Sequence, residues 1–183
     1  MDGEAKQVVN AAKQVGKDLK SGITPEEFGD LVTGFLKTGK MPKAALGFSD
    51  ERIEATYGQA YRLYNTGKYE DASYIFRLLV FLDPAEPKFG LGLAACFHMM
   101  KDYKNAIQTY MILTFLDPNT PIPYFHASDC YIEMRNPASA LLMLEMAVKR
   151  SGEQPEYQLL KERALLTIDK LKKELHIHDV SKK

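Results

Sequence analysis

The chain has 183 residues, 45% of them hydrophobic, and its 24 Lys and Arg balance 24 Asp and Glu to a formal net charge of zero. That balance gives no electrostatic reason to expect nucleic-acid binding, and no stretch approaches the ~20 apolar residues that insertion across a membrane needs. Two cysteines are too few for a disulfide framework or a zinc site, so we expect neither metal nor cofactor. The polar N-terminus lacks a secretory signal, which favours a cytoplasmic protein.

The segment over 1–48 carries two apolar stripes at helical spacing. The first stripe consists of Val8, Ala12, Val15 and Leu19, and the second of Phe28, Leu31, Val32, Phe35 and Leu36. Before the second stripe, residues 24–27 (Thr-Pro-Glu-Glu) are typical of a capping box with Pro at the first helical position. We therefore predict an N-terminal helical segment over residues 1–48.

A repeat with a period of about 34 residues begins after this segment. Residues 81–84 (Phe-Leu-Asp-Pro) recur as residues 115–118, and each copy follows an Ala with an aromatic residue four positions later. This pattern is typical of the tetratricopeptide repeat, a pair of packed helices. A third, degenerate copy has Ala140 with Leu144 in place of the aromatic residue and Gly152 in place of Pro. We predict an all-α protein with three tandem repeats in a curved array, at about 53–86, 87–120 and 121–153.

The repeats are followed by one more amphipathic helix. Its apolar stripe consists of Tyr157, Leu160, Ala164, Ile168, Leu171 and Leu175. A terminal repeat otherwise exposes an apolar face, so we expect a helix over 155–175 to cap the array and to complete a repeat domain over 49–175. Residues 176–183 are expected to form a flexible tail, in which His176 and His178 are too poorly spaced for a metal site.

The first helices of such repeats line the concave side of the array. Positions i, i+4 and i+7 of each first helix should face this groove, and they carry a surplus of apolar and aromatic residues. These groove residues are Tyr57, Tyr61, Tyr64, Leu91, Ala95, His98, Phe125, Asp129 and Ile132. Apolar surface that the fold does not use typically marks a binding site. Two alternatives are that the stripe is core, or that the chain's own N-terminal helix covers it.

Other motifs do not indicate catalysis. Residues 90–95 match the dinucleotide fingerprint G-x-G-x-x-A, but they lie within a repeat helix with no preceding strand. Cys96 and Cys130 are equivalent repeat positions and are expected to be buried as small apolar groups. No nucleophile with a base, phosphate loop or metal motif is found in the sequence. We therefore do not expect an enzyme.

Five segments resemble a known family. They are residues 46–49, 56–64, 67–72, 89–96 and 125–130, and they are similar to the class II (translocator) chaperones of bacterial type III secretion systems. The resemblance implies a non-catalytic bacterial cytosolic protein. Such a protein binds the two hydrophobic, pore-forming translocators before export and keeps them soluble, with an extended translocator segment lying in the groove.

The same resemblance bears on individual positions. By similarity, the family's groove positions are Tyr57, Tyr64, Leu91, Ala95 and His98, while the other groove residues come from helical geometry alone. The family often dimerises through its N-terminal helices, which implies a candidate homodimer interface within residues 4–36. Two other binding classes stay open: a heat-shock co-chaperone, which needs Lys, Arg and Asn in the groove, and an assembly scaffold.

Overall fold

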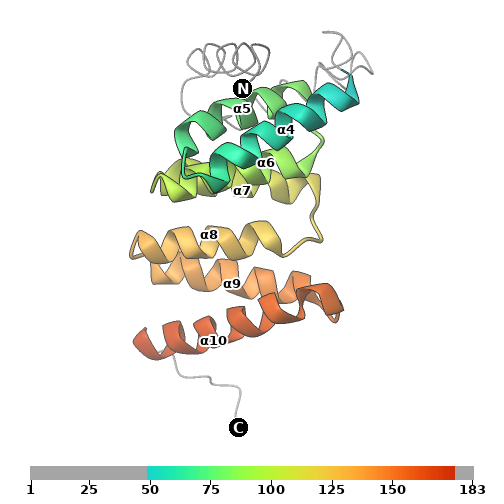
Figure 1. Ribbon diagram of the computed structural model, residues 1–183. Coiled ribbons are helices and arrows are strands. Elements are labelled where there is room, and N and C mark those ends of the chain that lie inside the picture. The colour runs from blue at the N-terminus through green and yellow to red at the C-terminus, as the bar shows by residue number, and fades with distance from the viewer. Residues whose placement is uncertain (1–48, 176–183) are drawn as a thin grey trace. The chain divides into compact units, whose positions relative to one another are not determined.

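The computed structural model describes residues 49–175 (Figure 1). The expected N-terminal segment over 1–48, the candidate dimer interface within 4–36 and the tail over 176–183 therefore lie outside the described residues. The described chain folds into helices and forms two compact units, which meet at residues 116 and 117 in the sequence. The predicted all-α class is confirmed.

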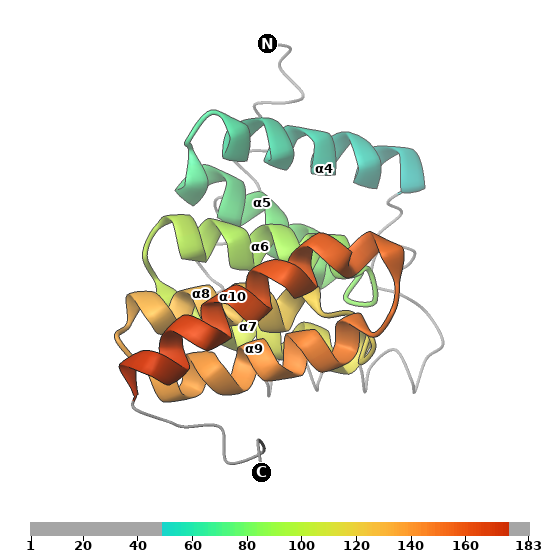
Figure 2. The same ribbon diagram turned by 90° about the horizontal axis from the view of Figure 1, so that it is seen from below.

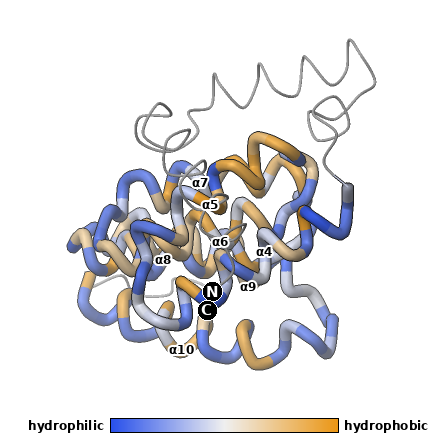
Figure 3. Tube along the Cα trace, turned by 45° about the horizontal axis from the view of Figure 1, so that its top comes forward, coloured by the Kyte–Doolittle hydropathy of each residue, from blue (hydrophilic) through white to orange (hydrophobic). Residues whose placement is uncertain are grey.

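The described part of unit 1 contains four helices, each packed against the next (Figure 1). They are α4 (Asp50–Asn65), α5 (Tyr69–Leu82), α6 (Pro87–Met99) and α7 (Tyr103–Leu116). Hydrophobic residues follow much of α5 (Figure 3). They are buried by both neighbouring helices, since α5 packs against α4 on one side and α6 on the other.

Unit 2 repeats this arrangement with three helices and one short 3₁₀ turn. They are α8 (Ile122–Glu133), α9 (Pro137–Ser151), η1 (Pro155–Tyr157) and α10 (Gln158–Glu174). Helix α9 packs between α8 and α10, and α10 crosses it at an angle (Figure 2). Unlike α5, α10 alternates between hydrophilic and hydrophobic residues, because only one of its faces is buried (Figure 3).

The helix ends follow local chemistry. At the start of α4 the Ser49 hydroxyl accepts a hydrogen bond from the Arg52 backbone N–H at 3.3 Å, and the Asn136 side chain caps α9 in the same way through Ser139. At the end of α4, Gly67 has a positive φ of 77°. This left-handed residue lets the chain turn sharply into α5 while its N–H still bonds to a carbonyl of the last turn.

The same turn recurs with the period of the repeat. Lys101 and Arg135, one and two repeat periods after Gly67, also have positive φ, at 62° and 54°. In all three turns the left-handed residue donates to the carbonyl three residues back, over 2.9–3.0 Å. The next residue donates to the carbonyl five residues back, which completes a Schellman motif. The backbone conformation of this turn is thus the same in all three repeats, although only the first turn has a glycine at the position with positive φ.

Small residues allow the helices to approach closely. Ala60, Ala72 and Ala94 are fully buried, as are the equivalent residues of the later repeats. A Cβ on Gly90 would lie 2.6 Å from the Leu113 side chain, and a Cβ on Gly92 would overlap the Phe76 ring. Packing thus accounts for the two glycines of the G-x-G-x-x-A sequence.

Both cysteines are buried, as expected from their equivalent repeat positions. Burial in apolar surroundings disfavours the thiolate and raises the pKa of Cys96 and that of Cys130 to about 12. The two thiols are therefore protonated at neutral pH and pack as small apolar groups.

Candidate peptide-binding site

Three tyrosines form a row along α4. The rings of Tyr57 and Tyr61 are stacked, with centroids 6.3 Å apart and planes at 24°. Tyr61 is 52% exposed, while Tyr57 and Tyr64 are half-buried. The core of α4 is formed by other residues, namely Ile53, Thr56 and Ala60. The row therefore presents aromatic surface and hydroxyl groups beyond those that the packing of α4 requires.

Tyr57 connects this row to the core of unit 1. Its ring centroid lies 6.1 Å from that of Phe76 and 5.8 Å from that of Phe89. The Lys88 ammonium lies 5.1 Å from the Tyr57 centroid and pairs with Glu54, and this hydrogen bond raises the pKa of Lys88. The residue pattern did not single out this pair. Its members nevertheless stand one repeat period apart, like equivalent residues of successive repeats.

A second row lies on α6, and its members are all half-buried: Leu91, Ala95 and His98. The last ring of each row is braced by the tyrosine that begins the following helix. Tyr64 meets Tyr69 edge-on at 5.3 Å, and His98 meets Tyr103 edge-on at 5.9 Å. Partial burial also raises the pKa of Tyr64, so that its hydroxyl stays protonated and able to donate a hydrogen bond.

The structure brings six of the nine predicted groove residues together in unit 1. Helices α4 and α6 are neighbours, joined by the contact of Tyr57 with Phe89 and by the ion pair of Glu54 with Lys88. All six residues keep part of their surface accessible. The two rows therefore expose apolar and aromatic side chains on neighbouring helices. That they contact a peptide remains a prediction.

In unit 2 the three remaining groove residues lie on α8 in different environments. Phe125 is only 7% exposed, because the Arg163 guanidinium of α10 lies 5.4 Å from its ring centroid and His126 meets it edge-on. Asp129 is half-buried, with a carboxylate oxygen 3.8 Å from His126 Nδ1, and Ile132 is half-buried. Sequence spacing alone did not reveal that a residue of α10 covers Phe125.

The described residues offer little for other kinds of site. Residues 49–175 contain no group of three His, Cys, Asp or Glu side chains that could hold a metal ion. Within the same part of the chain, no helix has both the length and the apolar character to cross a membrane.

Comparisons with known proteins agree with this architecture. The tetratricopeptide repeat family matches residues 53–85 and 90–119. The low calcium response locus protein H of Yersinia pseudotuberculosis is 34% identical over 152 residues, which are 82% of this chain and 90% of that protein.

Two solved complexes are similar to the chain over most of its length. The type III secretion chaperone SycD of Yersinia enterocolitica, in complex with a peptide of the translocator YopD, is 32% identical with a TM-score of 0.67. That similarity covers 69% of this chain and 97% of SycD. PcrH in complex with the chaperone binding region of PopD is 29% identical with a TM-score of 0.68, over 70% of this chain and 97% of PcrH.

Proposed function

Because the chain belongs to the family of type III secretion translocator chaperones, we propose that it binds an extended segment of a secreted, pore-forming translocator in the bacterial cytoplasm. The observation that carries this proposal is the pair of partly exposed rows on α4 and α6. The complexes of SycD with a YopD peptide and of PcrH with the chaperone binding region of PopD support it, since both proteins share this fold. Binding before export would keep an aggregation-prone client soluble, and no catalytic step is needed.

The chemistry of the rows suits an extended peptide. Such a peptide presents unpaired backbone donors and acceptors, and tyrosine combines a large apolar ring with a hydroxyl that can pair with them. Tyr57 and Tyr64 are already held by neighbouring rings, so less side-chain entropy is lost when a peptide binds them. A few well-buried anchors must then offset the ordering of the peptide.

A titration of the full chain with the fluorescently labelled chaperone binding region of PopD tests this proposal. We expect Ala95→Trp to abolish binding, because a bulky ring would fill the centre of the row on α6. A matched control is Ala55→Trp, at an exposed position of α4 outside the tyrosine row, which should leave the affinity within about twofold.

Circular dichroism must show unchanged helix content for both variants. Tight binding by a folded Ala95→Trp variant would contradict the proposed site. Absence of binding by the unmodified chain, both to this segment and to co-expressed translocators of its own bacterium, would refute the proposed function.

A further inference from the structure

The last helix exposes three leucines, of which Leu159 and Leu166 are the most exposed. Leu159 is 69% and Leu166 is 74% exposed, and their i, i+7 spacing places them on one side of α10. The opposite side is buried through Ala164, Ile168 and Leu171. A helix that only caps a repeat array needs a polar outer surface, so capping does not explain these leucines.

The repeat period places these leucines at binding positions. One period after Phe125, Asp129 and Ile132 stand Leu159, Arg163 and Leu166. From this correspondence, together with the exposure of both leucines, we propose that α10 supplies, beside α8 in unit 2, a row of peptide-binding residues formed by Leu159, Arg163 and Leu166. This inference rests on the proposed function and extends it to a helix that the sequence pattern predicts only as a cap.

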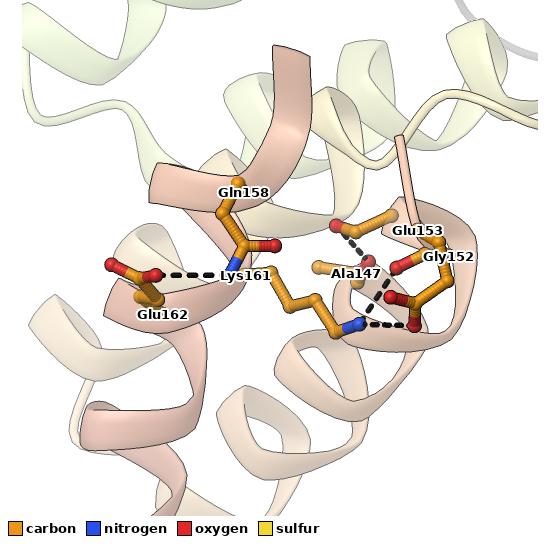
Figure 4. A network of polar contacts seen from close by, with 7 residues as sticks. Ala147, Gly152, Glu153, Gln158, Lys161 and Glu162 are labelled. Carbon is orange, nitrogen blue, oxygen red and sulfur yellow. Dashed lines mark hydrogen bonds and ion pairs between the residues drawn. The ribbon is translucent and has the colours of Figure 1, made fainter. Parts of the chain in front are cut away.

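Two other residues of α10 show that its exposed surface is not uniformly apolar. Gln158 and Glu162 stand one repeat period after Tyr124 and Ser128, which are buried in unit 2. In a complete repeat these positions would pack against a second helix, and none follows α10 within the described residues. Accordingly both are polar, and the Gln158 amide donates to the Glu162 carboxylate at 2.9 Å (Figure 4). Gln158 and Glu162 are thus polar at positions that would face a second helix, whereas Leu159 and Leu166 are apolar at positions that would face a ligand.

Side-chain contacts fix the orientation of this row. The Arg163 guanidinium over the Phe125 ring shows that this side of α10 adjoins α8. The start of α10 is tied to the end of α9 by Lys161, whose ammonium donates to the Gly152 carbonyl at 2.7 Å and lies 3.0 Å from the Glu153 carboxylate (Figure 4). The row on α10 is therefore held beside the row on α8.

The occupant that fits is a stretch of the client segment that lies over α8 and α10 in unit 2. Packed helices lie about 8–10 Å apart and an extended chain rises about 3.3 Å per residue, so roughly three residues of the segment span these two rows. Leu159 and Leu166 suit an apolar side chain. Arg163 and Lys170, both on this side of α10, suit an acidic neighbour. We therefore expect an extended stretch with one apolar anchor beside an acidic residue.

The same PopD titration of the full chain tests this inference. In the double variant Leu159→Ser with Leu166→Ser, loss of two apolar contacts should weaken binding by about 10- to 100-fold. The matched control is Leu165→Ser, an exposed leucine of the same helix that stands one repeat period after Tyr131 and outside the row. It should change the affinity by less than about twofold. As a second measurement, a benzoylphenylalanine photo-crosslinker at position 166 should label the PopD segment, and one at position 165 should not.

Each outcome separates this inference from the function on which it rests. Unchanged affinity of the double variant, with binding still lost in Ala95→Trp, would overturn the row on α10 and leave the proposed function standing. Absence of binding by the unmodified chain, both to the PopD segment and to co-expressed translocators of its own bacterium, would refute both. If the double substitution only dissociates a homodimer, as seen by analytical ultracentrifugation, the leucines serve self-association and the inference is wrong.

Discussion

Alanine substitutions at two glycines, Gly92 and Gly58, test the packing behind the tyrosine row. Both lie inside helices, where replacing glycine by alanine favours the helix by ~1 kcal/mol, because alanine loses less backbone entropy on folding. Around Gly58 an added Cβ meets no atom within 4 Å, so Gly58→Ala should stabilise the protein by about that amount.

At Gly92 the same methyl group would overlap the Phe76 ring. Phe76 is 2% exposed and packs against Tyr57 of the candidate binding surface, so its ring has little room to withdraw. Overpacking of this kind costs about 1–3 kcal/mol, which equals or exceeds the gain in helix propensity. We therefore expect Gly92→Ala to be about 1–3 kcal/mol less stable than Gly58→Ala.

Urea denaturation followed by circular dichroism measures this difference. The two variants share the same change in chemistry and differ only in the space around the added methyl group. Equal stability of Gly92→Ala and Gly58→Ala would refute the close approach of α6 to α5. A second readout is peptide affinity, which should fall for Gly92→Ala if the displaced Phe76 ring shifts Tyr57.

Two further predictions concern the turns and the thiols. Lys101→Gly and Arg135→Gly should each stabilise the protein by about 0.5–1 kcal/mol in urea denaturation, because glycine accepts a positive φ without steric cost, whereas Gly67→Ala should destabilise it. Because burial raises the pKa of Cys96 and of Cys130 to about 12, folding favours their protonated forms. Their contribution to stability should be full below the unfolded pKa of about 9 and decline as the pH rises toward 12. At constant ionic strength, the free energy of unfolding measured in urea should therefore fall more steeply over this pH range in the wild type than in the Cys→Ala variants.

The architecture was largely predictable because the repeat sets both spacing and packing. The repeat period places a small residue wherever two helices meet, so Ala60 and Ala72 mark close approaches in the sequence pattern itself. Gly67, two residues after the end of α4, carries the usual sequence signal for a left-handed helix end. The repeat period could not reveal that Lys101 adopts the same left-handed conformation, since lysine carries no such signal.

The candidate site was less predictable, since contacts between side chains of different helices do not follow from spacing alone. Phe125 and Tyr57 occupy equivalent positions, but one is buried beneath Arg163 and the other is half-buried beside Lys88. Arg163 lies on the last helix, for which the apolar stripe predicted only a capping role. The family resemblance was confirmed, while the contacts of individual groove residues with a peptide remain predictions.

The position of Tyr57 has a consequence for how client preference can change. Its ring belongs to the core through Phe76 and Phe89 and to the candidate binding surface through the part that stays accessible, so under the proposed function a substitution there would alter stability and recognition together. Tyr61, 52% exposed, contacts its neighbour Tyr57 and carries little of the core. Under the proposed function, Tyr61 can therefore change with the client at little cost in stability, whereas a change of Tyr57 also disturbs the core.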